Sequence, residues 1–252
     1  MSQPSIDITR ERRGEVELVR LGQGPGRPGL ELAALGRLKE ILLELMADRE
    51  ARVVILAVGG QSPAADPENR LQAWREARPV VELILDLGKP VIGMIDGPTE
   101  GIDAEVGLAC TWRIGSARAS FKLSVAALGI LHGSGWIPRM SEIVEPSLAL
   151  ELWLTGRMVK SDEALQLGLL QERTETRDEC EAASLRLASQ ICSGAPLSIK
   201  WAIESVRQGT RIPLEEGLSL ESTLFARSLA TADAREGIRS FLEKRPPRFR
   251  GE

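Results

Sequence analysis

Glu105 is the residue whose type and surroundings most clearly suggest chemistry. It lies in the stretch KPVIGMIDGPTEGIDAEVGLAC, residues 89 to 110, where nearly every side chain around it is small or apolar. A carboxylate in apolar surroundings is ion-paired, is protonated, or takes part in binding or catalysis. The sequence therefore makes Glu105 a candidate acid/base, with an ion-paired structural acid as the alternative.

The segment around Glu105 has the pattern of a strand that leads directly into a buried helix. The apolar run from Val91 to Ile95 predicts the strand, Gly97-Pro98 predicts the turn that ends it, and the following residues to Cys110 predict the helix. The first N–H groups of a helix have no carbonyl partner within it. Since ligands of α/β proteins bind beyond the carboxyl ends of strands, we expect these N–H groups to face a ligand.

Histidine and cysteine offer less chemistry. His132 is the only histidine, which excludes a multi-histidine metal site, and the three cysteines show no CxxC spacing. An odd number of cysteines argues against a disulfide framework, and a reducing cytoplasm fits best. His132 lies in the apolar turn LGILHGSG, residues 128 to 135, where Gly133 and Gly135 indicate close backbone approach.

The elements that must position Glu105 form a strand–helix–strand crossover. Alternating apolar and polar residues predict a β-hairpin with one buried face, leucines three and four apart predict an amphipathic helix, and a continuous apolar run predicts a strand covered on both faces. The expected elements are strands at 5–9 and 15–21 around a turn at 10–14, a loop at 22–29, a helix at 31–47, a strand at 52–58, a loop at 59–67 and a helix at 69–87. The strand at Val91 then follows, so two strand-to-helix junctions lie next to each other.

The rest of the chain is expected to be mainly helical. Two short strands are expected at 112–116 and 119–121. Helices are expected at 141–154, 161–168, 177–192, 196–208, 213–230 and 234–244. The sequence thus predicts an α/β crossover core followed by a helical C-terminal region.

Composition excludes several classes of protein. The chain has 252 residues, 43% of them hydrophobic, and a net charge of -4 with both signs interspersed. These values fit one core domain with a helical extension and give no sign of nucleic-acid or anionic-membrane binding. The N-terminal residues lack the apolar core of a signal peptide, and no apolar run is long enough to cross a bilayer. We therefore expect a cytoplasmic protein with no membrane partner.

Several segments resemble the crotonase (enoyl-CoA hydratase/isomerase) superfamily, in the same order along the chain. KPVIGMIDG is similar to the family's KPVIAAING, LGILHGSGWIPRM to LGIIPGAGGTQRL, and LTGRMVKSDEALQLGLLQE to LTGRPISAEEALRLGLVNE. ATADAREGIRSFLEKRPPRFRG resembles its C-terminal signature. The resemblance runs from about Ile6 to Gly251. It implies a crotonase-like ββα crossover spiral core at 1–195 and a C-terminal helical trimerisation region at 196–252.

The resemblance also implies an oxyanion hole, in which two backbone N–H groups bind the carbonyl oxygen of an acyl-CoA thioester. The first donor is Ala65, because QSPAAD, residues 61 to 66, matches an FSAGAD-like motif. The second donor is Ile102 in GIDAE, residues 101 to 105. Neighbouring positions expected to bind substrate are Ala64, Asp66, Gly101 and Asp103.

Glu105 matches the family's first catalytic glutamate, but the second, used by the hydratases, is Val125 here. A valine cannot transfer a proton. Either the reaction needs one acid, or His132 or Asp103 fills the gap, and an ordinary loop histidine and a helix-terminus acid are the alternatives. Other positions expected to contact substrate are Val125, Gly133, Trp136 as a wall of the acyl pocket, and Lys244, which matches a residue near the CoA phosphates.

The function implied is that of an acyl-CoA enzyme with Glu105 as its main acid/base. Loss of the second glutamate favours a specialised hydratase or dehydratase, an isomerase, or a lyase or hydrolase that cleaves a C–C bond. The alternative is a non-catalytic acyl-CoA-binding or assembly subunit, suggested by Val125 and the altered motifs. The family also implies a homotrimer or homohexamer and no cofactor other than the coenzyme A of the substrate.

Overall fold

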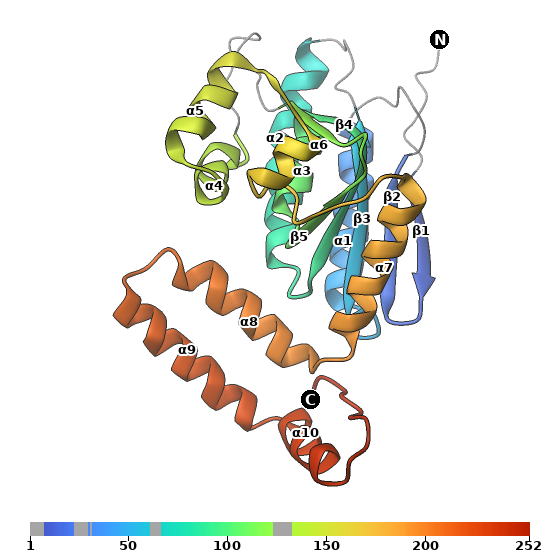
Figure 1. The fold of residues 1–252 in the computed structure, drawn as a ribbon, viewed down its shortest axis with the longest axis vertical. Helices are drawn as coiled ribbons and strands as arrows, with labels where there is room; N and C mark the ends of the chain where they lie inside the picture. The colour runs from blue at the N-terminus through green and yellow to red at the C-terminus, as the bar shows by residue number, and fades with distance from the viewer. Residues whose placement is uncertain (1–7, 23–29, 31, 61–66, 123–132) are drawn as a thin grey trace.

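The computed structural model of the protein describes residues 8–22, 30, 32–60, 67–122 and 133–252 (Figure 1). Within them one mixed sheet has the strand order β1-β2-β3-β4-β5-β8, with β6 paired to β4 and β7 paired to β6. The strands are β1 (Ile8–Arg13), β2 (Val16–Leu21), β3 (Val53–Gly60), β4 (Val91–Glu100), β5 (Trp112–Gly115), β6 (Ser120–Lys122), β7 (Met158–Lys160) and β8 (Glu172–Arg173). The helices are α1 (Leu32–Ala47), α2 (Pro67–Asp86), α3 (Ile102–Ala109), α4 (Trp136–Ile143), α5 (Pro146–Thr155), α6 (Ser161–Gln166), α7 (Arg177–Cys192), α8 (Pro196–Gly209), α9 (Leu214–Leu229) and α10 (Ala232–Leu242).

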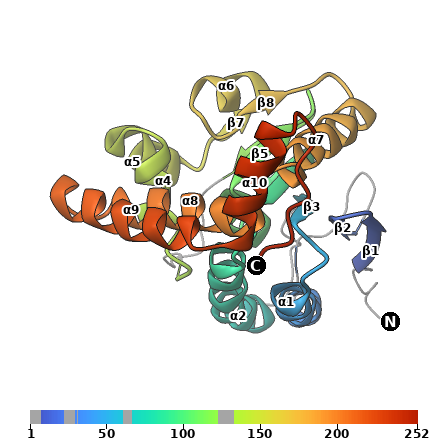
Figure 2. The same ribbon diagram turned by 90° about the horizontal axis from the view of Figure 1, so that it is seen from below.

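The sheet lies between two layers of helices, with α1 and α2 on one face and α7 on the other (Figure 2). β2, β3, β4 and β5 are parallel neighbours. Side chains of β3 alternate between the layers: Val54 and Leu56 pack in the cluster that contains α1 and α2, and Val53 and Ile55 pack against α7. The predicted parallel crossover and the α/β fold class are therefore confirmed.

The N-terminal hairpin is confirmed, but its turn lies later than predicted. Arg13 is opposite Val16, so Gly14 and Glu15 form the turn and residues 10 to 13 belong to β1. The charged run resembles a turn in sequence because a strand rarely carries so many charges. Here the charges form ion pairs across the sheet, as Arg10 does with Glu17 at 2.8 Å.

β4 also differs from the prediction, because it does not end at Gly97-Pro98. It continues to Glu100 and changes neighbour on the way. Ile92 to Ile95 pair with β5, whereas Pro98 to Glu100 pair with β6. Gly97 has φ +140, a conformation that favours glycine, so the Gly-Pro pair marks a change of partner strand rather than a turn.

One predicted helix is two helices, and two short strands escape prediction. The expected helix at 141–154 is replaced by α4 and α5, which are separated at Val144 and Glu145. Pro146 is the first residue of α5, where its missing N–H costs nothing, and it cannot continue α4. β7 and β8 were not predicted because strands of two or three residues carry no periodicity.

The helical C-terminal region is confirmed. α8 and α9 run side by side below the sheet, and α10 lies near the end of this pair where α8 begins and α9 ends (Figure 1). Apolar side chains on these helices are exposed, including Phe225 at 61% and Phe241 at 82%. No helix among the described residues is both long and apolar enough to cross a membrane.

Candidate active site

α3 begins directly after β4 and is buried over its whole length. Gly101 precedes it with φ +57 and ψ -122, a backbone conformation that glycine adopts at low cost. The first bond within the helix runs from the Glu105 N–H to the Gly101 carbonyl at 3.2 Å. The N–H groups of Ile102, Asp103 and Ala104 therefore precede the helical ladder, at the carboxyl end of β4.

The body of α3 is fixed by packing on two sides. One side joins the cluster that contains α1 and α2, and the other joins α4. The side chains involved are Ile102, Val106 and Ala109 on the first side and Ala104 and Leu108, with Trp136 and Met140 of α4, on the second. Since tightly packed helices shift little, the side chains that α3 carries are held in place.

The carboxyl end of α3 is bound by a buried arginine from β5. Arg113 donates to the Cys110 carbonyl at 3.0 Å and to the Leu169 carbonyl at 2.6 Å. Burial lowers the pKa of the Arg113 guanidinium, because water no longer solvates its charge. The helix terminus, with its partial negative charge, provides a favourable place for this cation.

Glu105 lies at the contact between α3 and the residues that lead into α4. It is 1% exposed, and its Oε2 accepts a hydrogen bond from the Ser134 hydroxyl. Ser134 is itself 4% exposed. A buried carboxylate therefore receives a hydroxyl donor that is also shielded from water, and in such surroundings a hydrogen bond is stronger than at the surface.

Arg139 of α4 folds back onto the same segment. Its Nη2 donates to the Ser134 carbonyl. Burial lowers the pKa of Arg139, and the charge of Glu105 opposes that shift. The two charged groups are thus close enough to influence each other electrostatically.

Asp103 is buried as well, at 1% exposure, but one of its oxygens has a structural partner. Oδ2 accepts from the backbone N–H of Leu30 at 2.7 Å. Leu30 lies two residues before α1, so Asp103 connects the entrance of α1 to the first turn of α3.

The family model described as Enoyl-CoA hydratase/isomerase matches residues 29–252. The chain belongs to this family. It is an acyl-CoA enzyme of the enoyl-CoA hydratase/isomerase type, and its resemblance to the crotonases in sequence is confirmed.

Relatives of this enzyme match it over nearly its whole length. A methylglutaconyl-CoA hydratase of Mus musculus, mitochondrial by name, is 30% identical over 97% of this chain and 82% of its own. An (E)-benzylidenesuccinyl-CoA hydratase of Thauera aromatica is 30% identical over 98% of this chain and 100% of its own. The crystal structure of an enoyl-CoA hydratase from Bacillus anthracis has a TM-score of 0.90 and 28% identity, covering 97% of this chain and 99% of that one.

The structure places some of the residues predicted for this enzyme's site together and separates others. Gly101, Ile102, Asp103 and Glu105 share the start of α3, and Gly133 is next to Ser134. Trp136 packs in the core between α3 and α4. Lys244 is exposed and follows α10 by two residues, and α10 lies far from α3 in the same chain (Figure 1). Positions outside the described residues are Ala64, Ala65, Asp66, Val125 and His132.

Ser134 and Arg139 were not predicted as site residues. The quoted motif contains a signal for each: LGILHGSGWIPRM has a serine where the family has alanine in GAGG, and it keeps the arginine of TQRL. A polar side chain that replaces a small apolar one in an apolar turn needs a partner, and Glu105 provides it.

Two buried cysteines are the other candidate nucleophiles that the described part of the chain contains near the sheet. Burial raises the pKa of Cys110 and of Cys180 to about 12, so both thiols are protonated near neutral pH. Within the described ranges no group of three or more His, Cys, Asp and Glu side chains is arranged to hold a metal ion.

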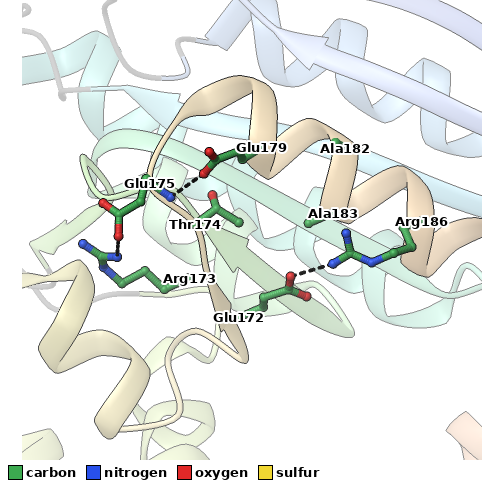
Figure 3. Close-up of a pocket in the computed structure, with 8 residues that line it drawn as sticks. All are labelled: Glu172, Arg173, Thr174, Glu175, Glu179, Ala182, Ala183 and Arg186. Atoms are coloured by element: carbon green, nitrogen blue, oxygen red, sulfur yellow. Dashed lines mark hydrogen bonds and ion pairs between the residues drawn. The ribbon is translucent and has the colours of Figure 1, made fainter.

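A separate surface pocket of about 370 Å³ lies between β8 and α7 (Figure 3). Its charged residues are already paired: Glu172 bonds Arg186 at 2.8 Å, and Glu175 bonds Arg173 at 2.6 Å. α7 covers the face of the sheet opposite α1 and α2, whereas α3 packs with α1 and α2. This pocket is therefore distinct from the Glu105 site.

Proposed function

We propose that this enzyme adds water across the double bond of an enoyl-CoA thioester, or removes it, with Glu105 as its main acid/base. One observation carries the proposal. Glu105 is a buried carboxylate one turn inside a helix whose first N–H groups lie at the carboxyl end of β4. That arrangement brings a proton-transfer group and backbone donors to one place, in a chain whose relatives are named hydratases.

The backbone donors stabilise charge in this mechanism. The thioester oxygen accepts from the N–H of Ile102 and from the N–H of Ala65. When hydroxide oxygen bonds to C3, the π electrons of the C2–C3 bond move toward the thioester oxygen, which becomes enolate-like. Fixed N–H donors at the start of α3, together with the helix dipole, stabilise that charge without reorganisation. Gly101 permits the turn that aims them.

Glu105 transfers the protons. It takes a proton from the attacking water, and it returns a proton to C2 as the enolate collapses. One carboxylate thus performs both transfers, because Val125 holds the sequence position of the second glutamate. His132 is the proposed assistant. Asp103 is the weaker candidate, since its Oδ2 already accepts from Leu30.

Val125 also leaves two neighbouring reactions open, both through the same enolate. A double-bond isomerase would move a proton from one carbon to another with a single carboxylate, and a lyase or hydrolase would break a C–C bond. Product mass separates them: hydration adds one water, isomerisation leaves the mass unchanged, and cleavage yields two fragments.

We further propose that the acyl group lies against Ala64, Asp66, Val125, Gly133 and Trp136. The reaction uses backbone N–H groups where other enzymes use a metal, so no metal or redox cofactor is needed. Activity should therefore survive treatment with EDTA.

We also propose a cytoplasmic location, which cell fractionation tests, although the mouse relative is called mitochondrial.

We propose a homotrimer or homohexamer assembled through the C-terminal helical region at 196–252. Support comes from the exposed apolar side chains of α9 and α10, such as Phe225 and Phe241. In such an assembly Lys244 would meet the CoA phosphates of a neighbouring subunit, since it lies far from α3 of its own. Light scattering should give about three or six times the chain mass of 27.4 kDa.

The test is a screen of enoyl-CoA thioesters, including the compounds that appear in the names of the relatives. Glu105→Gln is measured beside the wild type. We expect the wild type to hydrate at least one thioester, with loss of enoyl absorbance and gain of one water, and Glu105→Gln to lose this activity. Turnover that is equal in the two proteins would contradict the proposed role of Glu105.

A non-catalytic acyl-CoA-binding or assembly subunit is the second candidate, favoured by Val125 and by the altered motifs at residues 61–66 and 101–105. It predicts that acyl-CoA binds, as calorimetry would detect, while no thioester in the screen is converted.

A further inference from the structure

The contact between Ser134 and Glu105 sets this site apart from the quoted family motif. The family has alanine at this position, which cannot donate a hydrogen bond, whereas the Ser134 hydroxyl donates to Oε2 of Glu105. The two residues are 29 positions apart in sequence and both are buried, so the fold must bring them together. A buried hydroxyl paired with a buried carboxylate is a specific arrangement, because either group alone would be costly to bury.

The backbone of Ser134 is held in turn by α4. Arg139 donates from Nη2 to the Ser134 carbonyl. Between them lies Gly135, with φ +80, and a Cβ added there would lie 3.1 Å from Nη1 of Arg139. The turn therefore suits glycine on two grounds, and the arginine lies directly against it. Together these contacts limit where the Ser134 hydroxyl can point.

We propose that Ser134 is a positioning residue for Glu105: its hydroxyl holds Oε2 and so fixes which carboxylate oxygen exchanges a proton with the substrate. This inference rests on the proposed function of Glu105. A carboxyl group that can rotate presents either oxygen in many directions, and misplacement of a reacting group by about 1 Å can cost about 100-fold in rate. Where Val125 replaces the second glutamate, the orientation of the remaining carboxylate matters more.

A hydroxyl suits this role for an electrostatic reason. It donates a hydrogen bond without adding a charge, so it orients the carboxylate and still lets the group accept and release a proton. Because the donor favours the charged form of the acid, its removal should move the titration of Glu105 to higher pH. Arg139 of α4 also lies near enough to this carboxylate to influence it electrostatically. It stays in place in the variants below.

The test compares three variants of the full-length enzyme with an enoyl-CoA that the wild type converts. Ser134→Ala removes the hydroxyl and Ser134→Thr keeps it. Ser141→Ala is the matched control, because Ser141 lies on α4, seven residues after Ser134, and its hydroxyl donates at the exposed helix surface to the Ile137 carbonyl, 3.2 Å away. Each variant is measured for kcat, KM, the pH–rate profile and the melting temperature.

We expect Ser134→Ala to lower kcat by about 10- to 100-fold, the range of a hydrogen bond to a charged group, with a much smaller change in KM. The part of the pH–rate profile that follows the protonation of Glu105 should move to higher pH. Ser134→Thr should recover most of kcat, and Ser141→Ala should behave as wild type.

Three results would overturn the inference. One is a Ser134→Ala variant with wild-type kcat and pH profile. Another is a Ser134→Ala variant with a lowered melting temperature and an unshifted pH–rate profile, which is the result expected if Ser134 is purely structural. The third is a Ser134→Thr variant that melts as the wild type does but has the kinetics of Ser134→Ala. If the wild type converts no enoyl-CoA, the proposed function itself fails, which is a different and separately visible result.

Discussion

Two buried glutamates, Glu17 and Glu105, have similar burial and different surroundings. Glu17 of β2 is 3% exposed and bonds Arg10 through Oε1 at 2.8 Å and Arg12 through Oε2 at 3.0 Å. Glu105 is 1% exposed, and its Oε2 accepts from the neutral hydroxyl of Ser134. Both of the Glu17 oxygens are thus committed to guanidinium groups that never lose their protons.

In our proposal this difference separates a structural carboxylate, Glu17, from a reactive one, Glu105. Two arginines of β1 compensate for the burial of Glu17 in β2, so these ion pairs tie β1 to β2. A hydroxyl on Glu105 orients the group and adds no charge, so proton transfer remains possible. Burial is similar in the two residues, so the proposed difference in role rests on the groups that donate to their oxygens.

The largest expected effect is on catalysis by Glu105. Glu105→Gln keeps the shape of the side chain and removes its acid/base chemistry, so kcat/KM should fall by about 1,000-fold. Glu17→Gln makes the same chemical change in the hairpin and should leave kcat/KM essentially unchanged. Steady-state kinetics on both variants would test the contrast, which fails if the two losses are alike.

The second expected effect is on folding stability, and here the loss should be larger for Glu17→Gln than for Glu105→Gln. Glu17→Gln removes the buried carboxylate that Arg10 and Arg12 share. Arg10 keeps Glu44 as a partner and Arg12 keeps Asp48, and both arginines are partly exposed, so the free energy of unfolding should fall by only about 2 kcal/mol. Chemical denaturation measures this loss. Glu105→Gln should cost less, because the Ser134 hydroxyl can donate to the amide oxygen. A greater loss for Glu105→Gln would mean that Glu105 is the structural acid.

A smaller effect is expected at the turn before α4. Gly135→Ala puts a side chain at φ +80 against Arg139, so it should cost about 1 kcal/mol of stability and also lower kcat by displacing the arginine. Gly14→Ala in the hairpin is the control, with φ +61 and no atom within 4 Å of the added Cβ. We expect the two variants to have similar melting temperatures and only Gly135→Ala to have a lower kcat. Equal kcat values would show that Arg139 does not support the site.

The smallest effect concerns acid stability on the hairpin side. The hydrogen bond from Arg12 holds the pKa of Asp48 at about 2, below its usual 3.8. A lowered pKa means that this carboxylate contributes stability above its usual pKa and loses that contribution as pH falls toward 2. Asp48→Asn should therefore flatten the decline in the free energy of unfolding between about pH 4 and pH 2. An unchanged slope in denaturation curves over this range would contradict the assignment.

The bounds of an element could be predicted where the residues that determine them lie within or next to that element. The bounds of α7 are as predicted, because Thr176 and Glu179 form a capping box at its start. β4 continues beyond Gly97-Pro98 because β6 pairs with it there, and that partner lies about twenty residues further along the chain. The strand-to-helix junction and Glu105 were predicted from the residues and the family motif, although the junction lies at Gly101.

The hydrogen-bond partners of Glu105 and Asp103 could not be predicted from local sequence. Ser134 reaches Glu105 across 29 residues and Leu30 reaches Asp103 across 73, and no periodicity encodes either contact. The motif contained only the substitution of alanine by serine. Of the expected residues, Ala65, Val125 and His132 remain predictions of the sequence, since they lie outside the described residues.

Hydration in deuterium oxide tests the central claim most directly, because it follows the proton that Glu105 is proposed to deliver. The wild type and Glu105→Gln are incubated with the same enoyl-CoA in deuterium oxide, and mass spectrometry of the product measures deuterium at C2. The wild type should place one deuterium at C2 during each turnover, and Glu105→Gln should do so at a rate lower by about 1,000-fold. Incorporation by Glu105→Gln at the wild-type rate would show that another group moves the proton.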